Sequence, residues 1–316
     1  MSLPLVIVNP ESASGATRKA WPQIASDLRK HFSSFTVAFT QHSGQGTELA
    51  GDAARSGIDL IIACGGDGTI SEVANGILGS GKDVELGIVP SGTGGDFRRT
   101  LEIPSHSRSA ARMLREGRTR RIDVGRVSFV DHNGRDASRY FVGVASCGMS
   151  TQVIERVKSG TPDWLPDNTP SWLGGRVSFG TALFQTAARS DRARIVVQID
   201  DSHERHLTVA NLCVANARYF GGGMKIAPDA KLTDGRLDVV SVGDLSALRI
   251  FTSAPRLYLG SHLSMPEVSH ALARKVNVRA ANKNEQIGIE VDGELPGRLP
   301  ATFQVIPEAL RVRTAP

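Results

Sequence analysis

Glycine-rich stretches recur four times in the first hundred residues, and such stretches can bind phosphate. They are NPESASG (residues 9–15), TQHSGQG (40–46), GGDGT (65–69) and PSGTGGDF (90–97). Glycine lets the backbone approach a ligand closely and present its N–H groups, and a following helix adds partial positive charge. Together the four stretches predict a phosphate-binding cradle that is made of backbone and lacks a lysine.

Two common phosphate motifs are excluded. No G-x-x-x-x-G-K-[ST] occurs, so the cradle is not a Walker A loop, and Asn9-Pro10 stands where a dinucleotide-binding fingerprint would begin with glycine. A single glycine-rich turn would be interpreted as a tight connection between a strand and a helix. Four such turns at successive strand ends, two of them with an aspartate, indicate a ligand site instead.

The elements that must position these turns follow from the hydrophobic periodicity of the first 120 residues. Strands are expected at Leu5–Asn9, Phe35–Thr40, Ile58–Cys64 and Glu85–Val89, and helices at Thr17–His31, Thr47–Arg55 and Ser71–Leu78. This alternation predicts an α/β fold, a three-layer parallel sheet flanked by helices. Ligands bind such sheets beyond the carboxyl ends of the strands, which is where the four turns lie.

After Arg121 the pattern changes to strands that few helices interrupt. Strands are expected at Arg121–Val130, Tyr140–Ser146, Arg194–Asp200, Leu207–Ala215, Leu237–Val242, Val276–Arg279 and Ile287–Val291, and helices around residues 175–189 and 246–259. This predicts a second, mainly antiparallel, β-sandwich-like domain. We place the α/β nucleotide-binding domain at residues 1–124 and the β-rich domain at 125–302. Whether the C-terminal segment 303–316 packs back on the first domain is left open.

Composition indicates a soluble, cytoplasmic protein with an anionic partner. No apolar run approaches the ~18–20 residues that span a bilayer, the N-terminus has no signal peptide, and Cys64, Cys147 and Cys213 lie in apolar stretches typical of reduced thiols. The net charge of +5 and the pI near 9.3 favour a nucleotide or a membrane surface. Nucleic acid ranks low, because aromatic residues make up only 5% of the chain.

Two stretches could contact an anionic lipid surface. One is the arginine-rich run 108–121, and the other is TPDWLPDNTPSWLGG at residues 161–175, with two tryptophans and three prolines. A solvated helix and a packed loop explain these stretches as well as peripheral membrane binding does. The many strands are also compatible with a homodimer.

Four segments resemble, in this order, the diacylglycerol kinase catalytic superfamily. They are GGDGTISEVANG, GIVPSGTGGDFRR, GGGMKIAPDAKLTDGRLDVV and VDGE. This superfamily includes soluble bacterial lipid kinases, sphingosine and ceramide kinases and, more distantly, NAD kinases. The resemblance runs from Asn9 to Glu294. GGDGT is shared with NAD kinases, whereas the G-G-G-M…D-G-x-L-D-V block is particular to the lipid-kinase branch.

The resemblance implies an ATP site on the glycine-rich turns. The residues that would line ATP are Asn9, Pro10, Glu11, Ser12, Ala13, Thr40, Gly66, Asp67, Gly68, Thr69, Ile70, Ser71, Glu72 and Thr93. The family commonly has asparagine where this chain has Ser71 and Gly95, and alanine where it has Arg98. These departures leave the nucleotide preference open.

The resemblance also implies a magnesium site and a catalytic base in the second half. Magnesium takes oxygen ligands, so Asp234 would supply a carboxylate, and Lys231 and Arg236 only backbone carbonyls. The catalytic base falls in VDGE, on Asp292 or Glu294.

Three further aspartates complete the expected carboxylate set. Asp67 joins the catalytic residues, because its charge would repel phosphates unless magnesium lay between, and Asp96 and Asp123 would support the site through metal-bound water. Taken alone, each aspartate would be interpreted as a helix cap or turn residue, Asp96 most readily. Asp123 follows an arginine run within a strand, where a carboxylate needs a partner.

The leading interpretation is an ATP- and magnesium-dependent lipid kinase. It would transfer the γ-phosphate to the hydroxyl of a diacylglycerol-like or sphingoid lipid at a membrane surface, with its active site in the cleft between the domains. One alternative is an NAD kinase-like enzyme. The other is a non-catalytic regulator that binds nucleotide or lipid on the same scaffold.

Overall fold

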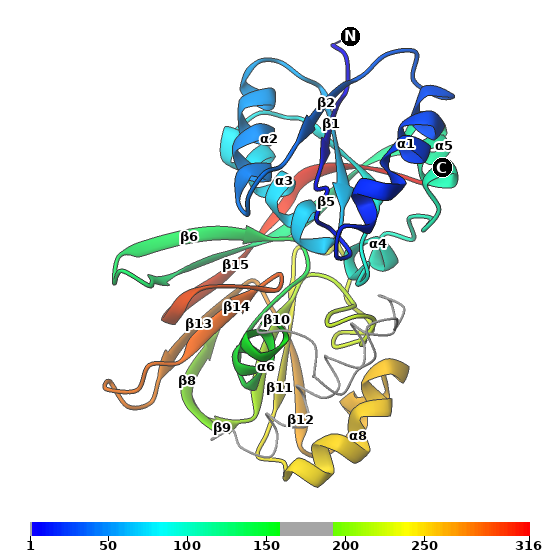
Figure 1. Ribbon diagram of the computed structural model, residues 1–316. Helices are drawn as coiled ribbons and strands as arrows, with labels where there is room; N and C mark the ends of the chain where they lie inside the picture. The colour runs from blue at the N-terminus through cyan, green and yellow to red at the C-terminus, as the bar shows by residue number, and fades with distance from the viewer. Residues whose placement is uncertain (1, 159–191) are drawn as a thin grey trace. The chain divides into compact units, whose positions relative to one another are not determined.

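Four short apolar strands form a parallel sheet in the first part of the computed structural model, which describes residues 2–158 and 192–316 (Figure 1). They are β1 (Leu5–Val8), β2 (Thr36–Phe39), β3 (Leu60–Gly65) and β4 (Glu85–Pro90), in the order β2-β1-β3-β4. The inner strands β1 and β3 are almost entirely buried, as expected of a sheet that helices cover on both faces. The predicted α/β sheet is confirmed.

Five helices accompany these strands: α1 (Ala16–Arg29), α2 (Gln45–Arg55), α3 (Asp67–Ser80), α4 (Asp96–Thr100) and α5 (Ser107–Glu116). In Figure 1, α1 lies beside α5 and α2 beside α3. The α2 and α3 backbones are in direct contact, because a Cβ added at Gly76 would lie 2.3 Å from the Thr47 carbonyl oxygen. This contact fixes the second half of α3 against the start of α2.

The start of α3 corrects one prediction. The helix begins at Asp67 and not at the expected Ser71. Gly66 is the extended residue before it, with φ −89° and ψ −173°. The last three residues of GGDGT therefore form the first turn of the helix, where unpaired N–H groups remain available to a ligand.

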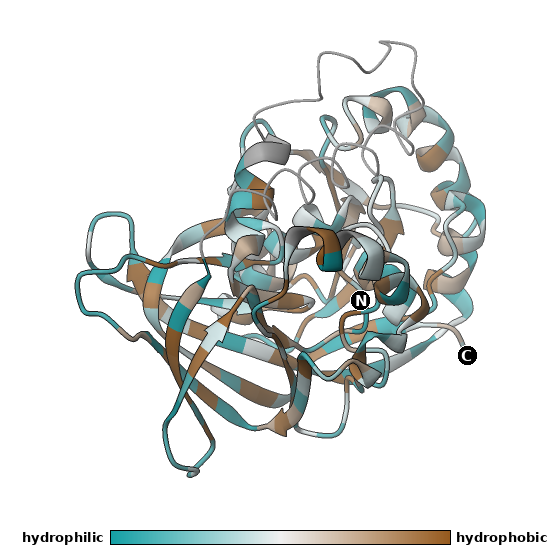
Figure 2. Cartoon of the chain, turned by 90° about the horizontal axis from the view of Figure 1, so that it is seen from below, coloured by the Kyte–Doolittle hydropathy of each residue, from teal (hydrophilic) through white to brown (hydrophobic). Residues whose placement is uncertain are grey.

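The second half of the chain consists mainly of antiparallel strands. They are β5 (Arg118–Asp131), β6 (Asp136–Phe141), β7 (Val144–Gly148), β8 (Ala193–Ile199), β9 (Arg205–Val209), β10 (Asn211–Ala215), β11 (Leu237–Val242), β12 (Val268–Ala273), β13 (Lys275–Ala280), β14 (Gly288–Val291) and β15 (Glu294–Thr314). One path through the sheet runs β12-β11-β10-β7-β14-β15. Figure 2 shows hydrophobic and hydrophilic residues alternating along several of these strands, the pattern of strands with one face on a core.

Apolar side chains of these strands form a buried hydrophobic core in this part. It includes Phe141, Leu212, Val239, Val276 and Phe303, and the rings of Phe141 and Phe303 meet edge to face. Two stretches predicted as single strands are each divided in two: 140–146 is split between β6 and β7, and 207–215 between β9 and β10. The predicted β-sandwich-like architecture is confirmed.

Among the described residues of this part, three segments are helical: α6 (Met149–Lys158), α8 (Ala247–Leu259) and a 3-10 turn at Ser261–Ser264. The helix α8 agrees with the expectation at 246–259. The helix expected at 175–189 and the Pro- and Trp-rich segment 161–175 lie outside the described residues. In the described ranges no helix is both long and apolar enough to cross a membrane.

The chain divides into two compact units. Unit 1 is Met1–Val124 with Pro307–Pro316, and unit 2 is Gly125–Ile306. The chain leaves unit 1 within β5 and returns to it within β15. The last residues of β15 pair in parallel with β4, Arg311 opposite Glu85.

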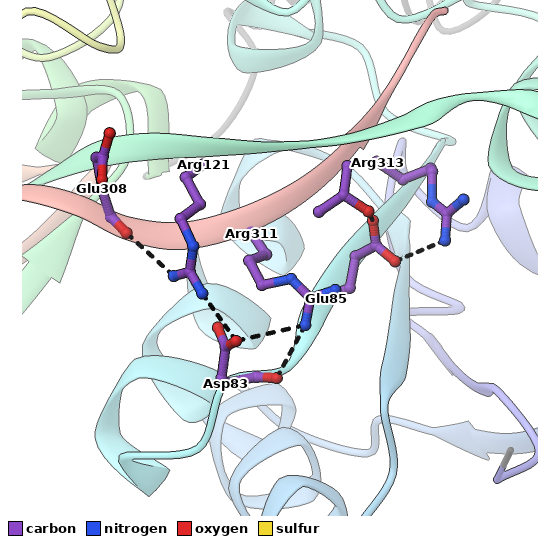
Figure 3. Close-up of polar contacts among 7 residues, drawn as sticks. Asp83, Glu85, Arg121, Glu308, Arg311 and Arg313 are labelled. Carbon is purple, nitrogen blue, oxygen red and sulfur yellow. Dashed lines mark hydrogen bonds and ion pairs between the residues drawn. The ribbon is translucent and has the colours of Figure 1, made fainter.

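Charged side chains hold this returning strand in unit 1 (Figure 3). Glu85 is 4% exposed, and its two carboxylate oxygens bind Arg313 at 2.7 Å and the Thr119 hydroxyl at 2.6 Å. Asp83 binds Arg121 at 2.8 Å and Arg311 at 3.5 Å. Two arginines of the 108–121 run therefore have acidic partners, Arg121 with Asp83 and Arg112 with Glu116.

Candidate functional site

The third and fourth glycine-rich loops touch each other through their backbones. A Cβ added at Gly92 would lie 2.4 Å from the Cα atom of Gly66. The Ser91 N–H donates a hydrogen bond to the Gly65 carbonyl oxygen at 2.9 Å. Glycine is therefore required at position 92 by the close approach of the loop that follows β4 to the turn that follows β3.

The first loop is tied to the same turn by side chains predicted to line ATP. The Asn9 amide nitrogen donates to the Thr69 hydroxyl at 3.1 Å, and the Gly66 N–H donates to the Ser12 hydroxyl at 3.3 Å. The Ser12 and Thr69 hydroxyls are 3.4 Å apart. Three of the four predicted loops thus meet at GGDGT.

The second loop is held by Glu72 on α3. Its carboxylate oxygens accept the N–H groups of Gly44 at 2.8 Å and Gly46 at 2.9 Å, and the Thr47 hydroxyl donates to the Glu72 carbonyl oxygen at 3.0 Å. Gly44 has φ +86° and immediately precedes α2. The Glu72 side chain therefore occupies the N-terminus of α2, which fixes the loop.

The residues predicted to line ATP differ in exposure. The exposed ones are Glu11, Gly68 and Thr93. Those of intermediate exposure are Asn9, Pro10, Ser12, Ala13, Gly66, Asp67 and Glu72. The buried ones are Thr40, Thr69, Ile70 and Ser71. Ile70 and Ser71 are 1% and 0% exposed, so their side chains belong to the packing of α3.

Asp67 binds the beginning of α4. Its two carboxylate oxygens accept the N–H groups of Asp96 and Phe97, each at 3.1 Å. A Cβ added at Gly94 would lie 2.6 Å from an Asp67 carboxylate oxygen, so the fourth loop needs glycine there. The negative charge of Asp67 is thus stabilised by the N–H groups at the start of α4.

Asp96 and Asp123, the supporting carboxylates, both have partners in unit 1. Asp96 binds Arg99 at 2.9 Å, and Arg99 also donates to the Gly94 carbonyl oxygen. Asp123 is 1% exposed and accepts the Glu308 N–H at 2.8 Å. The partner that a carboxylate in a strand requires is thus a backbone group of the C-terminal segment.

The VDGE segment is the turn of a β-hairpin between β14 and β15. Asp292 and Gly293 have φ +48° and +86°, the left-handed pair of a two-residue type I′ turn, for which Asp-Gly is a preferred sequence. The Asp292 carboxylate accepts three backbone N–H groups, from Val142 at 3.0 Å, Gly143 at 2.9 Å and Val144 at 3.1 Å. Asp292 therefore acts as a structural anchor for the junction between β6 and β7.

The predicted metal segment forms an exposed turn. The Asp234 carboxylate accepts the Arg236 N–H at 3.0 Å, and Gly235 has φ +67°. Residues 2–158 and 192–316 contain no cluster of three or more His, Cys, Asp or Glu arranged to hold a metal. One carboxylate with backbone carbonyls and water is an oxygen donor set that fits magnesium, which usually retains several waters.

Comparisons with known proteins agree with this arrangement. The family model for the diacylglycerol kinase catalytic domain matches residues 4–127, and that for the YegS C-terminal NAD kinase beta sandwich-like domain matches residues 165–314. A diacylglycerol kinase of Staphylococcus epidermidis is 30% identical over 313 residues, covering 98% of this chain and 91% of that protein. This chain belongs to the diacylglycerol kinase family.

A further relative and a solved structure also match along nearly the whole chain. A diacylglycerol kinase of Mycobacterium tuberculosis is 29% identical over 97% of this chain and 93% of that protein. A crystal structure of a diacylglycerol kinase from Bacillus anthracis is 21% identical and superposes with a TM-score of 0.72, covering 99% of this chain and 97% of that one. The fold is therefore shared with a member of the diacylglycerol kinase family along nearly the whole chain.

One buried residue next to the family motif was missed by sequence reasoning. Glu290 lies two residues before Asp292, is 6% exposed, and accepts the Gly293 N–H at 2.6 Å. A signal was available, because Glu290 is the only charged residue in the otherwise apolar or small β14 sequence GIEV. Asp123 in β5 is likewise a carboxylate within a strand.

Proposed function

We propose that this chain is an ATP-dependent lipid kinase that transfers the γ-phosphate to the hydroxyl of a diacylglycerol-like or sphingoid lipid. The observation that carries the proposal is the cradle in unit 1, where three glycine-rich loops meet at GGDGT and Asp67 is fixed by two hydrogen bonds. Membership of the diacylglycerol kinase family supports a kinase that acts on a lipid alcohol.

The nucleotide binds, in this proposal, to the loops of unit 1. Glycines let these loops pack closely against one another, and the first turn of α3 supplies N–H groups and partial positive charge for the triphosphate. The side chains of Asn9, Ser12 and Thr69 keep the loops in register. Phosphoryl transfer depends chiefly on such positioning and on charge compensation.

Glu294 accepts the proton of the lipid hydroxyl. Of the two candidates in VDGE, Asp292 has its carboxylate engaged by three backbone N–H groups. A carboxylate that accepts several such bonds is a weak base, because the bonds stabilise its charged form. Glu294 begins β15 immediately after the turn and is of intermediate exposure.

Magnesium would be held by the Asp234 carboxylate and the backbone carbonyls of Lys231 and Arg236. A bound magnesium ion supplies compensation for phosphate charge. Asp67, Asp96 and Asp123 are the proposed supporting carboxylates, which would act through metal-bound water. Asp67 and Asp96 lie in the third and fourth glycine-rich loops, and Asp123 lies in β5.

The lipid substrate places the reaction at a membrane surface, so we propose a cytoplasmic protein that binds membranes peripherally and acts in lipid metabolism. Arg108, Arg115 and Arg118 are exposed in and after α5 and supply positive charge for such a surface. Flotation with vesicles of neutral lipid and of 30% anionic lipid, a composition of about physiological charge, tests this. Equal binding to both would contradict it.

An NAD kinase-like activity is the second candidate, because the description of the second matching family model refers to NAD kinase. One experiment separates the two. Purified protein with ATP and magnesium is offered a panel of diacylglycerol, monoacylglycerol, sphingosine and ceramide in detergent micelles, and NAD in parallel. A phosphorylated lipid found by mass spectrometry supports the lipid kinase, and NADP formation supports the alternative. ATP binding without either product would favour a non-catalytic regulator.

A further inference from the structure

Glu290 is a buried carboxylate to which the proposed mechanism gives no role. It lies on β14, and its side chain is on the same face as Ser146 of the neighbouring strand β7, with which it is paired in register. It is 6% exposed. Burying a carboxylate is costly unless hydrogen bonds compensate its charge, so the partners of Glu290 indicate what it does.

The two carboxylate oxygens of Glu290 bind different segments. One accepts the backbone N–H of Gly293 at 2.6 Å, and the other accepts the Ser146 hydroxyl. Gly293 is the second central residue of the type I′ turn and directly precedes Glu294. Glu290 therefore holds the peptide group between Asp292 and Gly293, one residue before the proposed base.

The pairing between β14 and β15 is irregular beside Glu290. Ile289 is opposite Gly297 and Val291 is opposite Glu294, so residues 295 and 296 together face Glu290. A bulge of this kind interrupts the ladder and re-aims the neighbouring side chains. The regular ladder is interrupted directly after the pair of Val291 and Glu294, and the Glu290 carboxylate adds a further constraint on the turn beside it.

The bonds of Glu290 continue to a helix. The Ser146 hydroxyl is 2.8 Å from the Ser150 hydroxyl, and the Ser150 N–H donates to the Asn211 side-chain oxygen at 3.1 Å. Ser150 is the second residue of α6. The hairpin turn is thus connected through two serines to the start of α6.

We propose that Glu290 is a positioning residue that fixes the VDGE turn and thereby orients the Glu294 carboxylate toward the lipid hydroxyl. The inference rests on the proposed function, since Glu294 is the base only if a hydroxyl is deprotonated. Asp292 holds one side of the turn through residues 142–144, and Glu290 holds the other through Gly293. A misplacement of about 1 Å in a reacting group can reduce a rate by about 100-fold.

The test compares three variants with the wild type. In Glu290→Gln, the amide oxygen can still accept the Gly293 N–H, whereas Glu290→Leu cannot. Asp27→Asn is the matched control, because Asp27 is also buried, at 3% exposed, and also accepts a serine hydroxyl, that of Ser107 at 2.9 Å. We expect kcat for the lipid to fall about 10- to 100-fold in Glu290→Leu and about 3-fold in Glu290→Gln, with the KM for ATP unchanged. Asp27→Asn is expected to lower the melting temperature without changing kcat.

Hydrogen exchange of the Gly293 amide tests the positioning role without any lipid substrate. The Gly293 amide should exchange faster in Glu290→Leu than in the wild type, and at an unchanged rate in Asp27→Asn. Unchanged Gly293 exchange in both Glu290 variants overturns the positioning role, whether or not a lipid is phosphorylated. A wild-type kcat in Glu290→Leu also overturns it. If the wild type phosphorylates no lipid, the proposed function fails, and the catalytic part of this inference fails with it, while faster Gly293 exchange would still support the structural part.

Discussion

At the scale of single residues, the carboxylates of the predicted site bind backbone N–H groups of other segments. Asp67 holds the start of α4, Glu72 holds the loop before α2, and Asp292 holds the junction between β6 and β7. Each carboxylate thus fixes a loop and keeps its charge compensated within the protein. Substitution of any of them will therefore affect both local structure and chemistry, and variants must separate the two effects.

Asp67 offers such a separation. In Asp67→Asn the amide oxygen can still accept an N–H at the start of α4, so we expect a melting temperature near that of the wild type and a loss of kcat of about 100-fold from the lost charge. In Asp67→Ala both N–H groups lose their acceptor, and the free energy of unfolding should fall by a further ~1–2 kcal/mol.

Steady-state kinetics and urea unfolding measure these two effects. Asp52→Asn is the control, because Asp52 is an exposed residue of α2 whose side chain pairs only with Arg55 among the contacts of the described residues. Full activity in Asp67→Asn would show that the charge of Asp67 has no part in catalysis.

The three cysteines should be unreactive in the folded protein. All three are free and buried, and burial raises the pKa of the Cys64 and Cys147 thiols to about 12 and that of Cys213 as well. A thiol stays protonated at pH values below its pKa, and the thiolate is the reactive form. Titration with a disulfide reagent at pH 8 should label no cysteine in the native protein and three in guanidinium. Rapid labelling of the native protein would contradict the burial.

At the scale of elements, the strands and helices of unit 1 follow from the sequence because each is a local periodic pattern between turn residues. The exceptions are the start of α3, which the glycines of GGDGT obscured, and α4 and the end of β15, which were not among the expected elements. Glycine is a poor residue in a helix interior, but in the first turn it is tolerated where a ligand or another loop approaches closely. Gly66, the residue directly before that turn, is in close contact with Gly92 of the fourth loop.

The divided strands of unit 2 could not be predicted from local pattern. The apolar run 140–146 is interrupted because the N–H groups of Val142, Gly143 and Val144 donate to Asp292, about 150 residues away. The run 207–215 is interrupted at Ala210, whose N–H donates to the Val242 carbonyl oxygen. Both breaks depend on long-range partners, which a single sequence does not reveal. The bond from Asp123 to the Glu308 N–H is hidden for the same reason.

The pairing of β15 with β4 gives a prediction at this scale. Arg313→Ala would leave the buried Glu85 carboxylate without its cation, and the free energy of unfolding should fall by about 2–3 kcal/mol, less than for a fully buried pair because Arg313 is partly exposed. Arg311→Ala is the matched control. It removes the pair with the exposed Asp83 and should cost below about 1 kcal/mol. Urea denaturation measures both, and equal losses would contradict the role of the buried pair.

At the scale of the whole molecule, the chain combines an α/β unit that carries the glycine-rich cradle with a β-rich unit that carries VDGE and the Lys231–Arg236 turn. The relatives of the diacylglycerol kinase family match it over nearly its whole length, so the match covers both units. Activity should require both units, because nucleotide binding is proposed for unit 1 and proton acceptance for Glu294 of unit 2.

The most direct test of this account is transfer of labelled γ-phosphate from ATP to the preferred lipid by the wild type, Glu294→Gln and Asp292→Asn. We predict that Glu294→Gln loses about 100-fold or more in kcat, with an unchanged melting temperature and unchanged ATP binding. Asp292→Asn is predicted to unfold at lower temperature, because three N–H groups lose a charged acceptor. Lipid phosphorylation by Glu294→Gln at the wild-type rate would contradict the account.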